Sequence, residues 1–228
     1  MTQTTPVAGV REVRIPADHG SLTGDLVLPP RAGALVLFAH GSGSSRKSPR
    51  NTWVAGELQR AGVATLLFDL LTREEEARDV YTREHRFDIP LLARRLAQAT
   101  RFVDAQPDLA ALPLGYFGAS TGSAAALVAA HGLGARVRAV VSRGGRPDLA
   151  GAQALAGVTA ATLLIVGGND DVVLDLNEQA LREMTCEKRL VVVPGATHLF
   201  EEPGTLEEVA ALASRWFVEH LVANDARR

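Results

Sequence analysis

Six short, almost wholly apolar runs recur along this chain, and helix-like patterns lie between them. Strands with one wet face alternate apolar and polar residues, whereas strands buried on both faces read as continuous apolar runs. The pattern therefore predicts a mostly parallel central β-sheet with helices on both of its faces. The six runs are Leu35–Phe38, Val63–Phe68, Leu114–Phe117, Val137–Val141, Thr162–Val166 and Leu190–Val193.

Helical spacing of apolar residues separates these runs, so strands and helices alternate. Such alternation implies right-handed crossovers and an open α/β sheet. The functional residues of these sheets lie on loops at the carboxyl ends of strands, which directs the search for a site. The expected helices contain Val54, Leu58 and Ala61; Ile89, Leu92, Leu96, Ala99 and Val103 after a cap at Asp88; Leu176, Ala180 and Met184 after a cap at Asp175; and Val209, Leu212, Trp216 and His220 after a capping box of Thr205 and Glu208.

Two further segments stand apart from this pattern. Val10–Ile15 and Leu22–Leu28 flank the turn-forming residues 18–21 and predict an N-terminal β-hairpin. The densely charged segment Leu70–Phe87 predicts a solvated loop or short helix, with a flap near the site as the alternative.

Composition limits the classes of protein that the chain can belong to. With 228 residues, 46% of them hydrophobic, we expect one folded domain over residues 1–228. A net charge of −2 argues against nucleic-acid binding, and the single Cys186 precludes an internal disulfide. No leader, membrane span, metal site or cofactor is expected, so the predicted location is cytoplasmic. The oligomeric state stays open between a monomer and a homodimer.

The pentapeptide Gly118–Gly122 has the form G-x-S-x-G, directly after a predicted strand and before a predicted helix. In that context the pattern is typical of a nucleophile elbow, a tight turn that lifts a serine clear of the sheet. The serine also lies at a helix N-terminus, where the helix dipole favours developing negative charge. Ser120 is therefore the predicted nucleophile.

A serine hydroxyl needs a base to take its proton, and the base needs an orienting carboxylate. Asp170 and Asp171 follow the run that ends at Val166, and His198 follows the run that ends at Val193. The order Ser, Asp, His is the one expected of an elbow protein. We expect His198 to be the base and Asp170, rather than the adjacent Asp171, to be its partner.

Attack on a carbonyl creates an oxyanion, which two fixed N–H donors stabilise. Thr121 supplies one donor by its position after the nucleophile, and we expect Ser42, in the glycine-rich loop 40–45, to supply the other. His40 is favoured as a structural residue that holds this loop. The loop matches neither dinucleotide- nor P-loop-binding patterns, so no nucleotide site is expected.

These residues resemble the α/β-hydrolase superfamily, specifically small hydrolases of the dienelactone hydrolase-like family. The resemblance implies the α/β-hydrolase fold and a triad of Ser120, Asp170 and His198 that works through an acyl-enzyme. Dienelactone hydrolases proper use a cysteine nucleophile, so their lactone substrate is not carried over to this serine. The matching stretches are HGSGSS at 40–45, GASTG at 118–122, GGNDD at 167–171 and GATHLFEEPG at 195–204.

Clues to the substrate are few. The connection from Ser142 to Thr162 is too short for a large lid domain, which favours small or polar substrates over long acyl chains. Arg143 is a candidate for binding a substrate carboxylate, and the alternative is a salt bridge to a neighbouring Asp or Glu. Arg46, Lys47 and Arg50 have the same two interpretations.

Together these observations predict a serine hydrolase that cleaves small carboxylic esters. An amidase, thioesterase or acyltransferase with the same triad is the alternative within enzymes. A ligand-binding protein on a hydrolase fold is the alternative outside them, and covalent labelling of the serine distinguishes the two classes.

Overall fold

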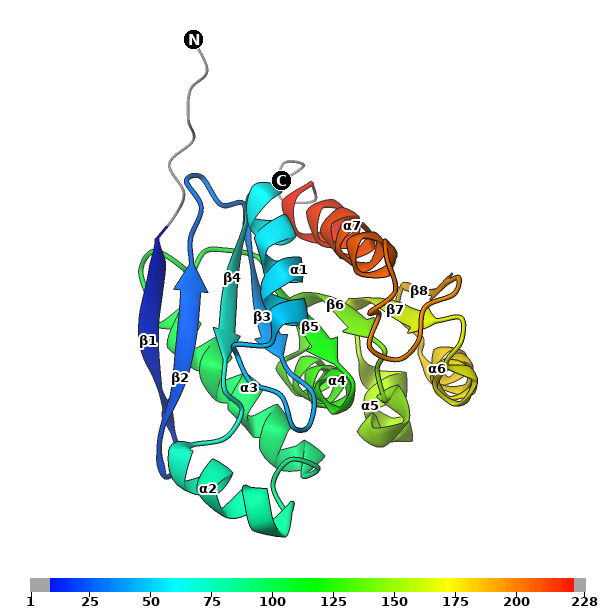
Figure 1. Cartoon of the computed structure of the whole chain (residues 1–228). Coiled ribbons are helices and arrows are strands. Elements are labelled where there is room, and N and C mark those ends of the chain that lie inside the picture. The colour runs from blue at the N-terminus through cyan, green and yellow to red at the C-terminus, as the bar shows by residue number, and fades with distance from the viewer. Residues whose placement is uncertain (1–8, 224–228) are drawn as a thin grey trace.

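The computed structural model describes residues 9–223, and an eight-stranded sheet forms their centre (Figure 1). The strands lie in the order β1-β2-β4-β3-β5-β6-β7-β8; β1 and β2 form an antiparallel hairpin, β2 pairs antiparallel with β4, and the other pairs are parallel. The mostly parallel sheet and the hairpin confirm the sequence prediction. The strands are β1 Val10–Ala17, β2 Gly20–Val27, β3 Ala34–Ala39, β4 Val63–Phe68, β5 Leu114–Ala119, β6 Val137–Arg143, β7 Ala161–Gly167 and β8 Lys188–Val193.

Apolar side chains pack on both faces of the sheet, in two separate clusters. Along β3, Leu35 and Leu37 belong to one cluster, while Val36 and Phe38 belong to the other. This alternation between two buried faces explains why the sequence of the strand shows no polar residues. α1 (Pro49–Arg60) and α7 (Thr205–Phe217) cover one face; α3 (Ile89–Asp104), α4 (Thr121–Leu133), α5 (Ala152–Gly157) and α6 (Asp171–Glu183) cover the other.

Two predicted helix caps are wrong. α6 begins at Asp171, so Asp175 lies inside the helix. Its buried stripe includes Val173 and the polar Asn177, which an apolar pattern passes over. Thr205 is the first residue of α7 rather than its cap, and its hydroxyl donates to the Glu202 carbonyl instead of forming a capping box.

The predicted cap at Asp88 is confirmed, and Ser48 is a further cap that the sequence pattern did not indicate. The Asp88 carboxylate accepts a hydrogen bond from the Leu91 N–H at 2.9 Å, at the start of α3. Ser48 caps α1 in the same way by accepting from the Asn51 N–H. Each cap satisfies one of the N–H groups that the first helical turn leaves without a partner.

The charged segment that follows β4 forms helix α2 (Arg73–Thr82), opened by a capping box of Thr72 and Glu75. Two ion pairs fix this helix to the rest of the molecule. The buried Arg95 of α3 binds Glu75 at its start, and the buried Asp79 binds Arg86 near its end. The two ion pairs therefore hold α2 in place beside the loop that follows β3.

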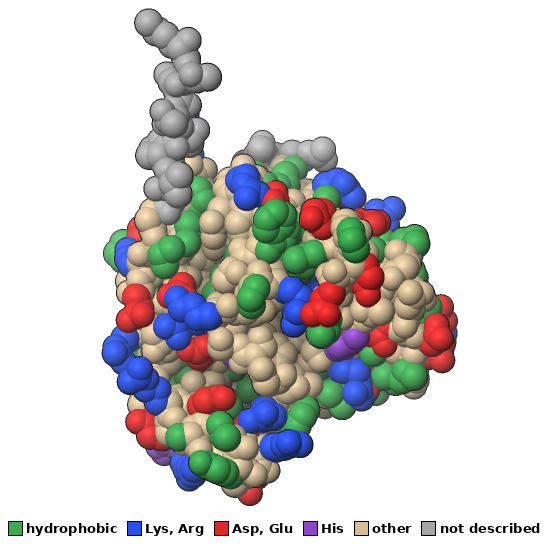
Figure 2. All heavy atoms as spheres, in the orientation of Figure 1, with side chains coloured by type: hydrophobic (Ala, Val, Ile, Leu, Met, Phe, Trp, Pro, Cys, Tyr) green, Lys and Arg blue, Asp and Glu red, His purple; other side chains and the backbone are tan. Residues whose placement is uncertain are grey.

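The connection between β6 and β7 holds only a 3-10 turn at Pro147–Ala150 and the short α5. It is too small for a lid domain, as predicted. In residues 9–223, no helix combines the length and the apolar character that crossing a membrane requires. On the face shown in Figure 2, basic and acidic side chains are interspersed, in keeping with a net charge of −2.

Candidate active site

Ser120 lies in the turn between β5 and α4, with φ 51° and ψ −124°. Such angles are strained for any residue with a side chain and persist only where the surroundings enforce them. The flanking glycines allow this turn. A Cβ at Gly118 would lie 2.4 Å from Ser123 Cα, and one at Gly122 would lie 2.2 Å from the Ala39 carbonyl oxygen. The sequence pattern thus corresponds to a sharp strand-to-helix turn that presents one serine.

Asp170 follows β7, and His198 follows β8, the neighbouring parallel strand. The carboxyl ends of the two strands meet at one sheet edge, where His198 Nδ1 lies 2.7 Å from Asp170 Oδ2. Asp171 is exposed in the first turn of α6, where its charge complements the helix dipole. Of the two adjacent carboxylates, Asp170 is the one in contact with the imidazole.

The elbow and the histidine loop both contact the segment that follows β6. The Ser120 N–H donates to the Arg143 carbonyl at 3.3 Å, and the Arg146 N–H donates to the Ser120 carbonyl at 3.1 Å. A Cβ at Gly144 would lie 3.6 Å from His198 Nδ1. Within residues 9–223 the Ser120 hydroxyl makes no hydrogen bond, to His198 or to any other group. Catalytic hydrogen bonds often tighten only when substrate is bound.

The loop after β3 runs directly against the elbow. A Cβ at Gly41 would lie 3.0 Å from Ser120 Cβ. The Ser42 N–H, expected to face a substrate oxyanion, instead donates to Thr121 Oγ1 at 3.0 Å. The structure therefore brings Ser42 and Thr121 together, with a side-chain contact that the sequence pattern did not indicate.

His40 fastens this loop to the end of β4. Its Nε2 lies 3.1 Å from the Leu70 backbone nitrogen, and its Nδ1 lies 2.9 Å from the Gly41 carbonyl oxygen. Because an N–H can only donate and a carbonyl can only accept, His40 is the neutral tautomer with its proton on Nδ1. Burial lowers the pKa of His40 below its ordinary value of 6.5, although the bond to Gly41 opposes the shift.

The lowered pKa of His40 predicts that the stability of the folded protein depends on pH. The unfolded chain takes up a proton at this residue as the pH falls through 6.5, whereas the folded protein does not until a lower pH. The stability that neutral His40 contributes is therefore complete above pH 6.5 and declines on acidification, by at most about 1.4 kcal/mol per pH unit. We expect His40→Gln to flatten this dependence in urea unfolding measured between about pH 7.5 and 5. Equal slopes for the variant and the unmodified protein would contradict it.

Arg143, at the end of β6, is 6% exposed and has no carboxylate partner among the described residues. Its Nη2 donates to Asn51 Oδ1 at 3.1 Å, and its guanidinium lies 5.9 Å from the centre of the Phe200 ring. Its Nε is buried without a partner. Burial, together with the nearby Arg50, lowers the pKa of Arg143 to about 10, so it stays charged at neutral pH. Within residues 9–223, Arg143 therefore forms no salt bridge, which was its alternative interpretation.

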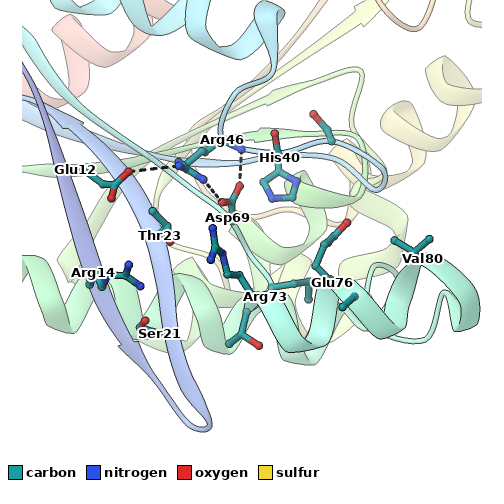
Figure 3. A pocket seen from close by; sticks show the side chains of 15 residues that line it. Glu12, Arg14, Ser21, Thr23, His40, Arg46, Asp69, Arg73, Glu76 and Val80 are labelled. Carbon is teal, nitrogen blue, oxygen red and sulfur yellow. Dashed lines mark hydrogen bonds and ion pairs between the residues drawn. The ribbon is translucent and has the colours of Figure 1, made fainter.

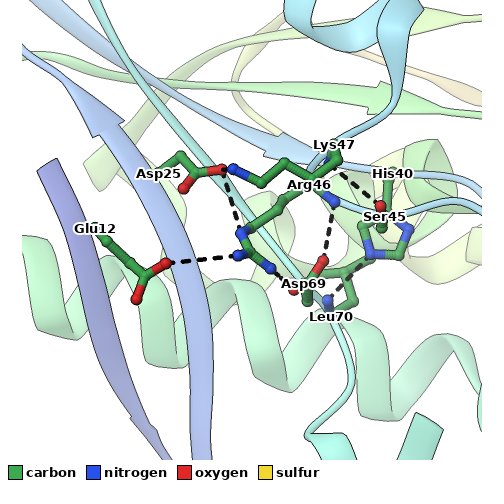
Figure 4. A network of polar contacts seen from close by, with 8 residues as sticks. All are labelled: Glu12, Asp25, His40, Ser45, Arg46, Lys47, Asp69 and Leu70. Carbon is green, nitrogen blue, oxygen red and sulfur yellow. Dashed lines mark hydrogen bonds and ion pairs between the residues drawn. The ribbon is translucent and has the colours of Figure 1, made fainter. Parts of the chain in front are cut away.

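A polar network holds the far end of the β3 loop (Figure 4). The Arg46 guanidinium contacts Asp69 at 2.5 Å, Asp25 at 3.2 Å and Glu12 at 3.6 Å. Lys47 also binds Asp25, at 2.7 Å. Arg46 and Lys47 are thus paired with carboxylates of the protein, which favours the structural interpretation for both. Asp69 was not singled out by the sequence, although its place directly after β4 is a signal that could have found it.

A cavity of about 450 Å³ lies between the hairpin, the β3 loop and α2 (Figure 3). Ser44 and Ser45 line it from the loop, and Arg73 and Glu76 line it from α2. Arg14 of β1 lines its other side. The cavity has both polar and apolar lining residues and borders the same loop that contacts the elbow.

The chain is similar in sequence and in fold to several known proteins. No protein-family profile matches the chain. Two curated relatives from strains of Mycobacterium tuberculosis, each described as "Putative phosphoribosyl transferase", are 59% identical over 210 residues, which is 92% of this chain and 46% of theirs. The chain thus spans about half the length of these relatives.

Two solved structures match over all or nearly all of their length. The crystal structure of dienelactone hydrolase from Anabaena variabilis is 56% identical, covers 95% of this chain and 100% of that one, and has a TM-score of 0.93. Est1E from Butyrivibrio proteoclasticus shares the fold at a TM-score of 0.77 and 16% identity, covering 92% of this chain and 98% of its own. By its identity to the Anabaena protein and its architecture, the chain belongs to the dienelactone hydrolase-like family of α/β-hydrolases.

Proposed function

We propose that this protein is a serine hydrolase that cleaves small carboxylic esters through an acyl-enzyme. The observation that carries the proposal is the strained Ser120 elbow at the same sheet edge as the 2.7 Å pair of His198 and Asp170. A nucleophile, a base and an orienting carboxylate from three strand ends form the recurring arrangement of serine hydrolases.

In the proposed reaction, His198 Nε2 takes the Ser120 proton as the serine oxygen attacks the ester carbonyl. Asp170 accepts a hydrogen bond from the Nδ1–H of His198, which fixes the tautomer whose Nε2 is free to act as a base. Collapse of the tetrahedral intermediate expels the alcohol, which receives its proton from His198. Water then attacks the acyl-enzyme by the same route and releases the acid.

The amidase, thioesterase and acyltransferase alternatives are compatible with the same triad geometry, and so is the ligand-binding alternative. The enzymatic alternatives differ in the acyl donor that reacts, whereas the ligand-binding alternative predicts no turnover. The name of the mycobacterial relatives belongs to proteins twice as long as the matched region. We propose hydrolase chemistry for this chain, because the Anabaena structure that it matches at 56% identity over the whole of that chain is described as a dienelactone hydrolase.

The acyl-chain preference tests this proposal. Because the β6–β7 connection holds only a short turn and α5, a long acyl chain has no large apolar cover. Each CH₂ that stays in water forgoes about 0.8 kcal/mol of burial. With p-nitrophenyl esters of increasing length, we expect kcat/KM to peak at about two to six acyl carbons. A maximum at about twelve carbons or beyond would contradict the predicted preference for short acyl chains, and no turnover of any ester would contradict the proposed reaction.

Arg143 makes a second prediction about the substrate. A buried guanidinium without a carboxylate partner is suited to receive one from a ligand. An ester that carries a free carboxylate should react about tenfold faster than its neutral isostere, in kcat/KM, since a charge-assisted hydrogen bond contributes about 1.5–3 kcal/mol. Arg143→Met should remove this preference, and Arg143→Lys should keep part of it. Equal rates for acidic and neutral esters would leave Arg143 a structural role against Asn51 and Phe200.

A further inference from the structure

The hydrogen bond between Ser42 and Thr121 changes how an oxyanion can be held. An oxyanion site needs donors that no protein group already occupies. The Ser42 N–H, the predicted second donor, is directed at Thr121 Oγ1 at 3.0 Å. This N–H is therefore not available to the substrate while the contact persists.

The Thr121 hydroxyl can also donate a hydrogen bond. A hydroxyl can accept one hydrogen bond and donate another. Thr121 is 5% exposed, and among the described residues its hydroxyl makes the single bond that it accepts from Ser42. Its hydrogen thus has no acceptor among residues 9–223. As the first residue of α4, Thr121 also has a backbone N–H without a partner inside the helix.

The two hydrogen-bond donors of Thr121 are its backbone N–H and its hydroxyl, and both belong to the residue that follows the nucleophile Ser120. The turn at Ser120 ends where α4 begins, so the N–H of Thr121 lies at the N-terminus of the helix. The β3 loop is held against this turn by the close approach of Gly41 to Ser120, which keeps Ser42 beside Thr121. His40 fixes the same loop from the other side through Leu70.

We propose that the Thr121 hydroxyl is a catalytic oxyanion donor, and that Ser42 acts through it. This inference rests on the proposed hydrolase function. As the Ser120 oxygen bonds to the carbonyl carbon and its proton passes to His198, the π-electron pair of the carbonyl moves to the oxygen. That oxygen receives hydrogen bonds from the N–H and the O–H of Thr121. When the double bond re-forms, the leaving alkoxide departs and takes the proton from His198.

The Ser42 N–H strengthens this donor without touching the substrate. Hydrogen bonds in a chain polarise one another, so an N–H that donates to Oγ1 makes the O–H of Thr121 a better donor. Ser42 is thus a positioning residue in place of the direct donor that the sequence predicts. The opposite arrangement, in which the Thr121 hydroxyl merely blocks the Ser42 N–H, gives opposite results in the test below.

The test compares Thr121→Val, which removes the hydroxyl and keeps the shape, with Thr121→Ser, which keeps the hydroxyl. With p-nitrophenyl butyrate, we expect Thr121→Val to lower kcat about 10²–10³-fold with little change in KM, the loss typical of one oxyanion donor. Thr121→Ser should recover most of that loss. An unchanged or faster Thr121→Val enzyme would overturn the proposal, as would an equal loss in both variants.

A matched control is available at Thr205. Like Thr121, it is the first residue of a helix and is buried, but its hydroxyl donates to the Glu202 carbonyl in α7's own entry loop. Thr205→Val should therefore leave kcat unchanged while exposing any general cost of the substitution in thermal unfolding. If Thr121→Val does not fold, Thr121→Ala provides the same comparison with Thr121→Ser.

A second readout reports on the oxyanion itself. A trifluoromethyl ketone forms a tetrahedral adduct with a catalytic serine, and its inhibition constant should rise in Thr121→Val by the same factor by which kcat/KM falls. An inhibition constant that does not change would overturn the proposal. Fluorophosphonate labelling of the unmodified protein distinguishes a failure of the proposed hydrolase function from a failure of the role of Thr121. No label on Ser120 refutes the proposed function. Normal labelling of Ser120, together with an undiminished rate in Thr121→Val, refutes only the role of Thr121.

Discussion

Replacing Ser120 with alanine is expected to lower kcat for p-nitrophenyl esters by at least about 10⁴-fold and to leave the protein folded. The proposed acyl-enzyme forms on the Ser120 oxygen, so the variant has no nucleophile to acylate. The hydroxyl makes no hydrogen bond within residues 9–223, and its removal therefore breaks no contact that holds the strained turn. Steady-state kinetics and thermal unfolding of the purified variant measure the two effects separately.

Cys186 provides the control for this prediction. It is half-buried between α6 and β8, and burial raises the pKa of its thiol, which keeps the thiolate fraction low. Alkylation with iodoacetamide should therefore leave hydrolysis intact. The serine mechanism would be refuted if Ser120→Ala kept more than a few per cent of the rate, or if alkylation of Cys186 abolished it.

Asp170→Asn is expected to reduce kcat by about 10⁴-fold, the size of loss known for the orienting aspartate of a serine protease triad. The carboxylate lies 2.7 Å from His198 Nδ1 and selects the tautomer with its proton there. An amide at the same place can donate to Nδ1 and so favour the opposite tautomer, in which Nε2 cannot accept the serine proton. Kinetics with the same p-nitrophenyl ester measure this loss.

Asp171→Asn is the matched comparison, since it makes the same chemical change one residue away. The Asp171 side chain is exposed at the start of α6, where its charge contributes about 0.3–1 kcal/mol to helix stability. We expect little change in kcat and a small loss of thermal stability. A larger kinetic effect at Asp171 would move the role of the orienting acid to that residue, and two mild effects would point to a different carboxylate.

The sequence predicts those features that a short stretch of chain determines by itself. The elbow needs glycines two residues before and after Ser120, and the structure shows the contacts that exclude any larger residue there. The apolar runs identify the strands because both faces of the sheet are buried. The order of Ser120, Asp170 and His198 then brings the latter two to one edge, since β7 and β8 are neighbours.

Features that depend on tertiary contacts were beyond the sequence pattern. The sequence pattern places the start of α6 too late in the chain, because Asn177, a buried polar residue on its inner face, interrupts the apolar stripe. The bond from Ser42 to Thr121 joins residues 79 positions apart, and only the packing of the β3 loop on the elbow creates it. The neutral partner of Arg143, Asn51, is likewise 92 positions away. No local spacing encodes such pairs.

The most direct test of the account is the mass of the protein after reaction with a fluorophosphonate. This reagent phosphonylates a serine only where a base activates the hydroxyl and an oxyanion site holds the adduct. We expect one adduct per chain, located on the peptide that contains Ser120, and none on Ser120→Ala. An unmodified protein, or an adduct at another residue, would contradict the assignment of Ser120 as the nucleophile of a serine hydrolase.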